Sequence, residues 1–423
     1  MANRALNLRF SRCAAALSDY NPDMRIRPAI VAAFVLMLAA CQRQPPAQPL
    51  AHEVYVWQRQ WTPAVVAAIA DAGPTFRAYR VLAAEESRGG ALQAMRPELA
   101  LLERAQMPVT AVIRLDGSIP PPDEKALAER IRAIAAGWRA AGVRLHGIEI
   151  DHDCATARLA DYARLLRALR ADWPAPLRLS ITALPAWRDA SALPALLALV
   201  DESVLQVHAV QSPAGGLFDP TTARRWIDAY AEHTPGPFRI ALPAYGLRVG
   251  FDDRGSATAV EAEAPRDISA SDVRELRVTP DQVGTLLRGL ERARPRHLDG
   301  VVWFRLPTAD DHRAWSLATL NAVIAGDPLR PAVRVTFDAA ADGAHDLVLA
   351  NAGRIETALP QAVVIAAYGC SGGDALEGYR LDHSGDDWRF VRTVDKMLRV
   401  GRERRIGWLR CDTIAGMKID EAH

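Results

Sequence analysis

Segments with the pattern of β-strands alternate with helical segments over most of this 423-residue chain, and this alternation constrains the fold more than any other feature. Strands are predicted at residues 52–57, 75–82, 109–115, 146–153, 177–183, 204–210, 238–245 and 300–306. The segments between them carry apolar residues at helical spacing, most clearly residues 123–141. Eight strands that alternate with helices predict an α/β fold, a (β/α)8 TIM barrel over residues 51–327. A doubly wound open sheet is the alternative, but the Gly-rich phosphate turn expected early in that fold does not occur in the sequence.

The pattern changes after Pro328, where short strand-like runs separated by Gly-rich turns predict a small β-sandwich-like domain over residues 328–423. The runs are residues 333–337, 346–350, 362–368, 379–381, 388–391 and 406–411. Cys370 and Cys411 both end predicted strands of this domain, and in an exported protein we expect a disulfide between them. Two separate thiols are the alternative. Cys154 would then be unpaired, and neighbouring carboxylates would raise the pKa of its thiol, which disfavours a catalytic role.

The first 50 residues are predicted to form a signal segment and a tether instead of part of a folded domain. A short basic stretch begins at Met24, and the apolar run over residues 30–40 is too short to span a membrane. The run ends in Leu-Ala-Ala-Cys41, which resembles a bacterial lipobox, so we expect Met24 to be the true start and Cys41 to be lipidated. Gln42 follows the cysteine where an Asp would favour the inner membrane, so we expect a lipoprotein of the outer membrane that faces the periplasm. A Pro- and Gln-rich tether follows up to residue 50.

An acidic row marks the fourth predicted strand, His-Gly-Ile-Glu149-Ile-Asp151-His-Asp153. Side chains alternate along a strand, so the three carboxylates share one face, with successive ones about 6.6 Å apart. Like charges this close are costly to bury, so a row of three carboxylates indicates a place where the protein needs negative charge. The carboxyl end of a barrel strand is where active sites lie. The alternative is an exposed strand end with Asp153 as the N-cap of the next helix.

Further candidates lie at or just after the ends of the other predicted strands, where acids, amides and aromatic rings together suit a sugar. These candidate ligand-binding residues are Trp57, Asp116, Trp187, His208, Gln211, Tyr245, Trp303 and Arg305. His152 and His208 lack the spacing of metal ligands, so we expect neither a catalytic metal nor another cofactor. A Gly-x-Ser-x-Gly nucleophile motif does not occur. The net charge of +1 argues against nucleic acid as a partner.

Three segments resemble glycoside hydrolase family 18, the chitinase-like barrels. The stretch 146–153 is similar to the family's Asp-Gly-x-Asp-x-Asp-x-Glu signature, and Pro243-Ala-Tyr-Gly246 and Gly300-Val-Val-Trp303 are similar to its seventh and eighth strands. The resemblance implies that Asp153 is the general acid, that Asp151 orients a substrate acetamido group and that Glu149 supports them. It also implies that Trp303 forms the floor of the sugar site and that a group of the substrate, instead of an enzyme side chain, acts as the nucleophile.

This sequence departs from that family in its acid, which is Asp instead of Glu, and in its sixth strand, which lacks the family's Tyr-Asp pair. Most of residues 50–415 more closely resembles a bacterial family of unknown function, DUF3142. Two functions are therefore expected: an exported hydrolase that acts on a polysaccharide, or a lipoprotein that binds a glycan without cleaving it. In both, a glycan is the partner, and the lipid anchor is the only membrane contact.

Overall fold

The computed structural model describes residues 49–86, 92–117, 123–171, 173–208, 216–261, 268, 270–340 and 343–420. Met1–Pro49 and Leu50–His423 are separate units. The predicted signal with Cys41, most of the tether, and Gln211 lie outside the described residues. Within the described ranges, no helix combines the length and apolar character needed to span a bilayer.

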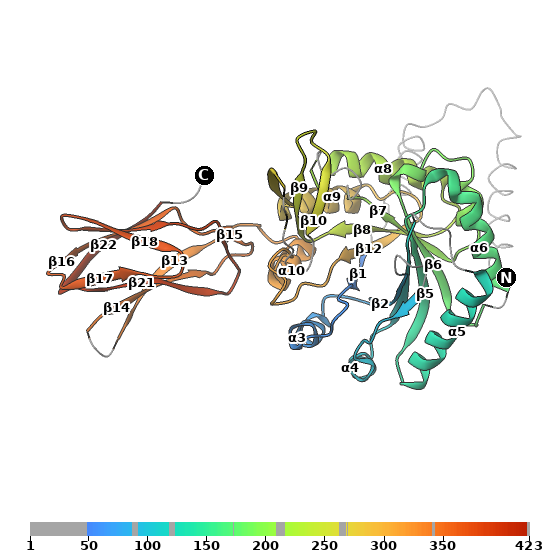
Figure 1. The fold of residues 1–423 in the computed structure, drawn as a ribbon, viewed down its shortest axis with the longest axis horizontal. Coiled ribbons are helices and arrows are strands. Elements are labelled where there is room, and N and C mark those ends of the chain that lie inside the picture. Colours follow the sequence, from blue (N-terminus) through green and yellow to red (C-terminus); the bar gives the residue numbers. More distant parts are fainter. Residues whose placement is uncertain are drawn as a thin grey trace, which may run out of the picture. The chain divides into compact units, whose positions relative to one another are not determined.

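The predicted barrel is confirmed (Figure 1). Its strands are β1 (Ala51–Val56), β2 (Tyr79–Glu86), β4 (Val109–Leu115), β5 (Leu145–His152), β6 (Arg178–Ala183), β7 (Glu202–Gln206), β8 (Phe238–Pro243) and β12 (Leu298–Phe304). They follow the order β1-β12-β8-β7-β6-β5-β4-β2, all neighbours are parallel, and pairing of β1 with β2 closes the sheet. The short β3 (Leu92–Ala94) pairs antiparallel with β2. In a closed parallel barrel all carboxyl ends of the strands lie at one rim.

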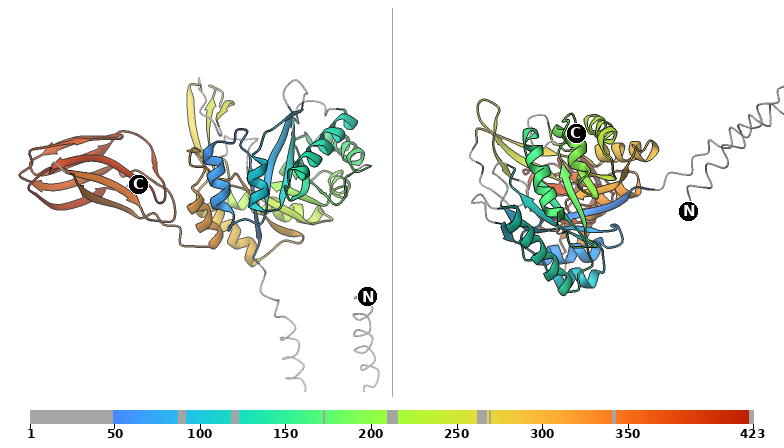
Figure 2. Two further views of the ribbon diagram at one scale, coloured as in Figure 1. Left: turned by 90° about the horizontal axis from the view of Figure 1, so that it is seen from below. Right: turned by 90° about the vertical axis from the view of Figure 1, so that its right-hand side faces the viewer.

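Helices surround the strands (Figure 2). They are α3 (Pro63–Ala72), α4 (Leu99–Ala105), α5 (Glu124–Ala140), α6 (Leu159–Ala171), α7 (Leu193–Leu197), α8 (Pro220–His233), α9 (Pro280–Arg292) and α10 (Leu317–Ala325). Short polar residues fix several starts: Asp123, Asp219 and Thr279 each accept a hydrogen bond from the backbone N–H three residues later. The apolar face of α5, with Leu127, Ile131, Ala135 and Trp138, is buried as its spacing predicts.

Some boundaries differ from the prediction. The second strand starts at Tyr79 and runs to Glu86 instead of covering residues 75–82, because the backbone N–H of Thr75 closes a turn onto Ala72. The last helix starts at Leu317 instead of residue 310, because Ser316 caps it.

The polar segment 248–278 is more ordered than its composition suggests. It contributes to a small antiparallel sheet of β9 (Gly246–Phe251), β10 (Ala257–Glu261) and β11 (Asp272–Arg277), in the order β10-β9-β11. β10 and β11 are mostly exposed and lack an apolar alternation, so their sequence does not predict strands. Pairing with β9, whose Val249 and Phe251 are buried, holds them instead.

The C-terminal region is the predicted β-sandwich-like domain. One sheet has the order β13 (Val333–Ala339), β14 (His345–Asn351), β21 (Glu403–Arg410), β17 (Gly372–Ala375). The other has the order β18 (Tyr379–Ser384), β19 (Asp387–Arg392), β16 (Ala362–Tyr368), β22 (Thr413–Asp420), and β15 (Thr357–Ala358) pairs with β20 (Met397–Leu398). Apolar residues from both four-stranded sheets, such as Leu347 and Ile365, form a core separate from that of the barrel. The prediction missed β17 and β22, whose residues are mostly Gly, polar or exposed.

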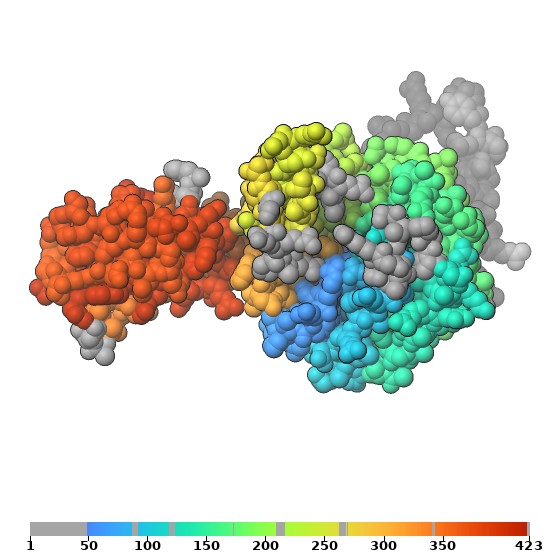
Figure 3. All heavy atoms as spheres, viewed as in Figure 1, coloured from blue at the N-terminus to red at the C-terminus, as the bar shows by residue number. Residues whose placement is uncertain are grey.

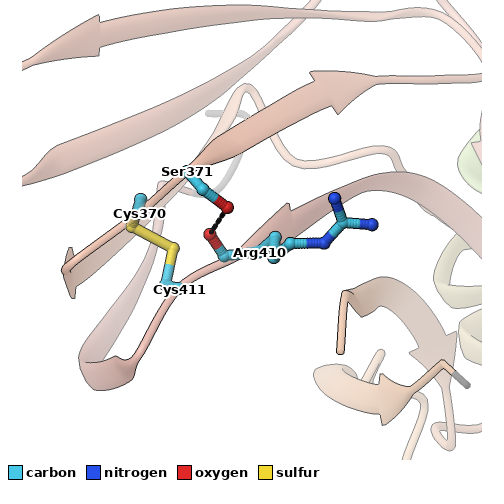
Figure 4. Close-up of a disulfide and its surroundings, with 4 residues drawn as sticks. All are labelled: Cys370, Ser371, Arg410 and Cys411. Carbon is cyan, nitrogen blue, oxygen red and sulfur yellow. Dashed lines mark hydrogen bonds between the residues drawn. A yellow bond between two sulfur atoms is a disulfide. The ribbon is translucent and has the colours of Figure 1, made fainter. Parts of the chain in front are cut away.

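Cys370 and Cys411, the pair indicated by the sequence, form a disulfide (Figure 4). Cys370 lies between β16 and β17, and Cys411 lies between β21 and β22. At both places the chain passes from one sheet of the sandwich to the other. Beside the bridge, the backbone N–H and the hydroxyl of Ser371 both donate to the carbonyl oxygen of Arg410. The disulfide therefore joins two neighbouring crossovers of the sandwich.

We expect the variant Cys370→Ser/Cys411→Ser to have a free energy of unfolding lower by about 2–4 kcal/mol, since the bridge closes a loop with a sequence separation of 41 residues. Urea unfolding followed by the fluorescence of the sandwich tryptophans measures the difference. Reduction of the wild-type protein should give a similar loss. An unchanged midpoint in both experiments would contradict the prediction.

Candidate functional site

A cavity of about 1040 Å³ opens at the carboxyl rim of the barrel. Its walls come from the ends of β1, β4, β5, β6, β7, β8 and β12 and from β9 and β10. It is lined by Tyr55, Trp57, Gln58, Arg59, Gln60, Thr62, Val65, Arg114, Asp151, Asp153, Thr182, Gln206, His208, Ala241, Tyr245, Leu247, Val260, Glu261, Phe304, Arg305, Thr308, Asp310 and Asp311. Figure 3 shows β9–β11 in yellow on the same face of the barrel as its first elements in blue. The volume is that of a pocket for an organic ligand.

Two carboxylates of the acidic row line this cavity. Asp151 is buried, and its oxygens accept hydrogen bonds from Arg114 Nη1 at 2.8 Å and from Thr182 Oγ1 at 2.7 Å. Asp153 accepts a hydrogen bond from Gln206 Nε2 at 3.2 Å. Burial raises the pKa of Asp153 from 3.8 to about 7, and the charge of Asp151 adds to this effect. Asp153 therefore holds a proton near neutral pH while Asp151 is paired with a cation.

The backbone around Asp153 is fixed by a close approach. A Cβ at Gly117, in the loop after β4, would lie 2.0 Å from the carbonyl oxygen of Asp153. Only glycine fits there without movement of the chain. The following short helix has Ala155 at its N-cap position and no side-chain cap. The alternative reading of Asp153 as an N-cap is therefore wrong.

Glu149, the third member of the row, is fully buried inside the barrel and does not line the cavity. Its oxygens accept hydrogen bonds from Tyr55 Oη at 2.7 Å and from Arg80. Burial raises the pKa of Glu149, and the nearby Arg80 opposes that effect. Tyr55 reaches both the cavity and Glu149, so Glu149 supports the cavity from inside the barrel.

Arg80 is the centre of a buried ionic network inside the barrel. It contacts Glu149, Glu53 and Glu202, and its Nε lies 2.7 Å from Glu53 Oε2. Arg239 adds a second cation that bridges Glu53 and Glu202. These charges come from five different strands, so the network links strands all around the barrel.

Aromatic rings and arginines form much of the cavity wall. Phe304 packs edge-on against Trp57 and Tyr245, with ring centroids 5.3 and 5.4 Å apart. The Arg114 guanidinium lies 5.7 Å from the centroid of Trp57, and that of Arg305 lies 5.4 Å from the centroid of Tyr245. Arg305 is buried and binds Asp311 Oδ2 through Nε and Nη2 at 2.9 and 2.6 Å. Apolar ring faces beside fixed polar groups suit the mixed surface of a sugar.

The structure brings together Asp151, Asp153, Trp57, His208, Tyr245 and Arg305 at the cavity, all indicated by the sequence. Three other candidates lie elsewhere. Trp303 is buried on the outer face of β12 and donates to His52 Nδ1 at 3.0 Å. Trp187 is buried and donates to the carbonyl oxygen of Cys154 at 3.0 Å, and the backbone N–H of Asp116 donates to Glu86. These three were expected at the site, and the structure corrects this.

The reason for the Trp303 error is strand alternation. Neighbouring residues point to opposite faces, so one of Trp303 and Phe304 faces the barrel interior, and it is Phe304. Sequence reasoning also missed Tyr55, Arg114, Thr182 and Gln206. All four lie on predicted strands at positions that alternate into the barrel, and that period was the signal that could have identified them.

Cys154 is buried and not disulfide-bonded, and burial raises the pKa of its thiol to about 11. A thiol at such a pKa is a poor nucleophile at neutral pH. In the ranges described by the structure, no three His, Cys, Asp or Glu side chains are grouped as metal ligands would be.

Residues 105–309 match a family described as a domain of unknown function, DUF3142, and residues 334–412 match a second such family, DUF8456. The first match runs from α4 to the loop after β12 and confirms the resemblance to DUF3142 indicated by the sequence. No curated protein matches this chain.

Several solved structures are similar to part of this chain or to most of it. The spore cortex-lytic enzyme SleL of Bacillus cereus is 15% identical with a TM-score of 0.43, over 62% of this chain and 72% of that one. A chitinase of Chromobacterium violaceum is 17% identical with a TM-score of 0.43, over 62% and 96%. Chitinase ChiA74 of Bacillus thuringiensis is 10% identical with a TM-score of 0.45, over 88% and 100%. At these values the similarity establishes neither the fold nor the chemistry of this chain, and both follow from its own strands and cavity.

Proposed function

We propose that the DUF3142 barrel of this chain hydrolyses a glycosidic bond of a polysaccharide, with Asp153 as the general acid. The observation that carries the proposal is a carboxyl group whose pKa is raised to about 7 at the wall of a cavity of about 1040 Å³. Cleavage of a glycosidic bond needs a proton on the leaving oxygen, and a carboxyl group with a raised pKa can supply it near neutral pH.

Asp151 has the properties of the partner of this acid. Arg114 and Thr182 fix its carboxylate, and it lies on β5 two residues before Asp153, which follows the end of that strand. A fixed carboxylate can accept the N–H of a substrate acetamido group and turn its carbonyl oxygen toward the sugar carbon. That oxygen then acts as the nucleophile, so the enzyme needs none of its own. An acetamido sugar is therefore the preferred substrate.

A barrel that binds a glycan without cleaving it is the second candidate. The shorter side chain of Asp153, compared with the Glu of the chitinase-like signature, favours this alternative, because displacement of an acid by one methylene can cost about 100-fold in rate. In that case Trp57, one of the aromatic residues that line the cavity, takes the role expected of Trp303.

The deciding experiment incubates the purified protein with a panel of polysaccharides with and without acetamido groups and measures new reducing ends. Hydrolysis of acetamido polymers supports the proposal. Binding of a polymer with no hydrolysis anywhere in the panel contradicts it and supports the binding module.

We expect kcat/KM to fall as the pH rises through about 7. The pKa of Asp153 is raised, so the protonated form that a general acid needs predominates below about pH 7 and is lost above it. Rates measured from pH 5 to 9 at low substrate concentration check this. A rate that stays constant up to pH 9 would exclude Asp153 as the acid.

We also propose that the chain is anchored through Cys41 in the outer membrane and faces the periplasm. The basic stretch, the short apolar run and Leu-Ala-Ala-Cys41 support this. We expect Cys41→Ser to prevent incorporation of a labelled fatty acid and to release the protein from membranes. Equal incorporation in the variant and the wild type would contradict the anchor.

A further inference from the structure

Charged side chains of alternating sign lie side by side on three neighbouring strands at the carboxyl rim of the barrel. Glu85 of β2 pairs in register with Arg114 of β4, and Arg114 pairs in register with Asp151 of β5. Neighbouring strands lie about 4.8 Å apart, so an anion, a cation and a second anion follow one another within about 10 Å. Arg114 and Asp151 line the cavity, whereas Glu85 does not.

The contacts of Arg114 follow this row. Its Nη1 donates to Asp151 Oδ2 at 2.8 Å, and its Nε lies 3.6 Å from Glu85 Oε1. Glu85 also binds Arg59, whose Nε and Nη2 donate to its two carboxylate oxygens at 2.7 Å each. Two such bonds between one arginine and one carboxylate are strong and fix the orientation of both groups. Arg59, Glu85, Arg114 and Asp151 therefore form one charge line of alternating sign.

The charge line ends beside Asp153, the candidate acid. Asp153 follows Asp151 by two residues, lines the same cavity and accepts its hydrogen bond from the uncharged Gln206. A nearby anion favours a proton on Asp153, and a nearby cation disfavours it. The pKa of Asp153 agrees with this placement: burial raises it most, the charge of Asp151 raises it further and Arg114 lowers it.

Other titratable side chains of the cavity wall come from β1, β10 and the loops after β7, β8 and β12. They are Tyr55, Glu261, His208, Tyr245, Arg305, Asp310 and Asp311. Burial lowers the pKa of His208 to about 4 and raises the pKa of Tyr55, so both rings are uncharged at pH 7. Glu261, Arg305 and the buried Glu149 each have an ion-pair partner of their own. Within the described residues, Arg114 is the cation paired with Asp151.

We propose that Arg114 and Glu85 are positioning residues that keep the negative charge on Asp151 and the proton on Asp153. Arg114 fixes the carboxylate of Asp151 and compensates its charge. Glu85 binds two arginines and limits the positive charge that they place beside Asp153, so Asp153 keeps its proton near neutral pH. The inference rests on the proposed function in one respect, that Asp153 is the acid of the reaction.

Carbon NMR of the full chain, with the aspartate carboxyl groups labelled, follows the titration of Asp153 without a substrate. The variant Asp153→Asn assigns the signal. Arg114→Met removes a cation, so we expect the midpoint of the titration to rise by about one pH unit. Glu85→Gln keeps the size of the side chain and one acceptor oxygen but removes an anion, so we expect the midpoint to fall by about half a pH unit. A merely structural role of these residues would not shift the midpoint in opposite directions.

Conservative and distant substitutions are the controls. Arg114→Lys and Glu85→Asp keep the charges and should stay close to the wild-type midpoint. Glu129→Gln and Arg130→Met make the same kinds of change at exposed residues of α5 and should leave the midpoint unchanged. An unchanged midpoint in Arg114→Met or in Glu85→Gln, or shifts of both in one direction, would overturn the inference. If both midpoints shift as expected and the polysaccharide panel shows no hydrolysis, the proposed function fails and the charge line stands.

Discussion

Replacing Asp153 with asparagine is expected to lower kcat on an acetamido polysaccharide by at least about 100-fold, and by up to about 10⁴-fold. The amide keeps the size of the side chain and can still pair with Gln206, whose amide donates to Asp153 Oδ1 in the wild type. It removes the proton that the leaving oxygen must receive. Loss of the proton donor affects the transition state and not the bound substrate, so KM should change little.

The measurement is a steady-state assay of new reducing ends at pH 6 for both proteins. The matched control is Asp161→Asn, the same chemical change at a partly exposed residue of α6, which should leave the rate unchanged. The residual rate of Asp153→Asn should no longer fall above pH 7. Hydrolysis that survives the substitution at the wild-type rate would remove Asp153 from the mechanism.

Replacing Arg80 with methionine is expected to lower the free energy of unfolding by about 3–5 kcal/mol. The side chain of Arg80 is only 3% exposed, and its guanidinium contacts the carboxylates of Glu53, Glu149 and Glu202. Without it, Arg239 still contacts Glu53 and Glu202, but no ion pair to Glu149 remains in the described part of the chain. Glu149 would be left without a cation in the barrel interior. The loss comes from these uncompensated charges more than from the ion pairs themselves.

Denaturant unfolding of the barrel, followed by circular dichroism, measures this effect. Arg164→Met is the matched control, because its ion pair with Asp161 is exposed and worth at most about 1 kcal/mol. If the free energy of unfolding of Arg80→Met lies within about 1 kcal/mol of the wild-type value, the ionic network does not stabilise the barrel to the expected extent. The double variant Arg80→Met/Glu149→Gln should recover part of the loss, because Glu149 then carries no charge.

The sequence by itself determined the architecture and part of the candidate site. Strand and helix patterns are local, so eight alternating pairs were enough to predict a barrel, and its size followed from their span. The acidic row was equally local, because residues two apart in an extended chain point to the same side, and Asp151 and Asp153 both line the cavity. For the same reason four of the eight residues proposed from strand ends, Trp57, His208, Tyr245 and Arg305, line the cavity.

Only the tertiary structure decided which face of each strand is inside. Trp303 and Phe304 are neighbours on β12, so one points into the barrel and the other points toward the helices. Both faces of such a strand are buried, so the sequence pattern does not show which of the two residues points inward. The partners of the acids come from other strands: Arg114 from β4, Thr182 from β6 and Gln206 from β7. Closure of the barrel places these side chains within hydrogen-bond distance of β5. The raised pKa of Asp153 depends on burial by distant segments, so it exists only once the chain has folded.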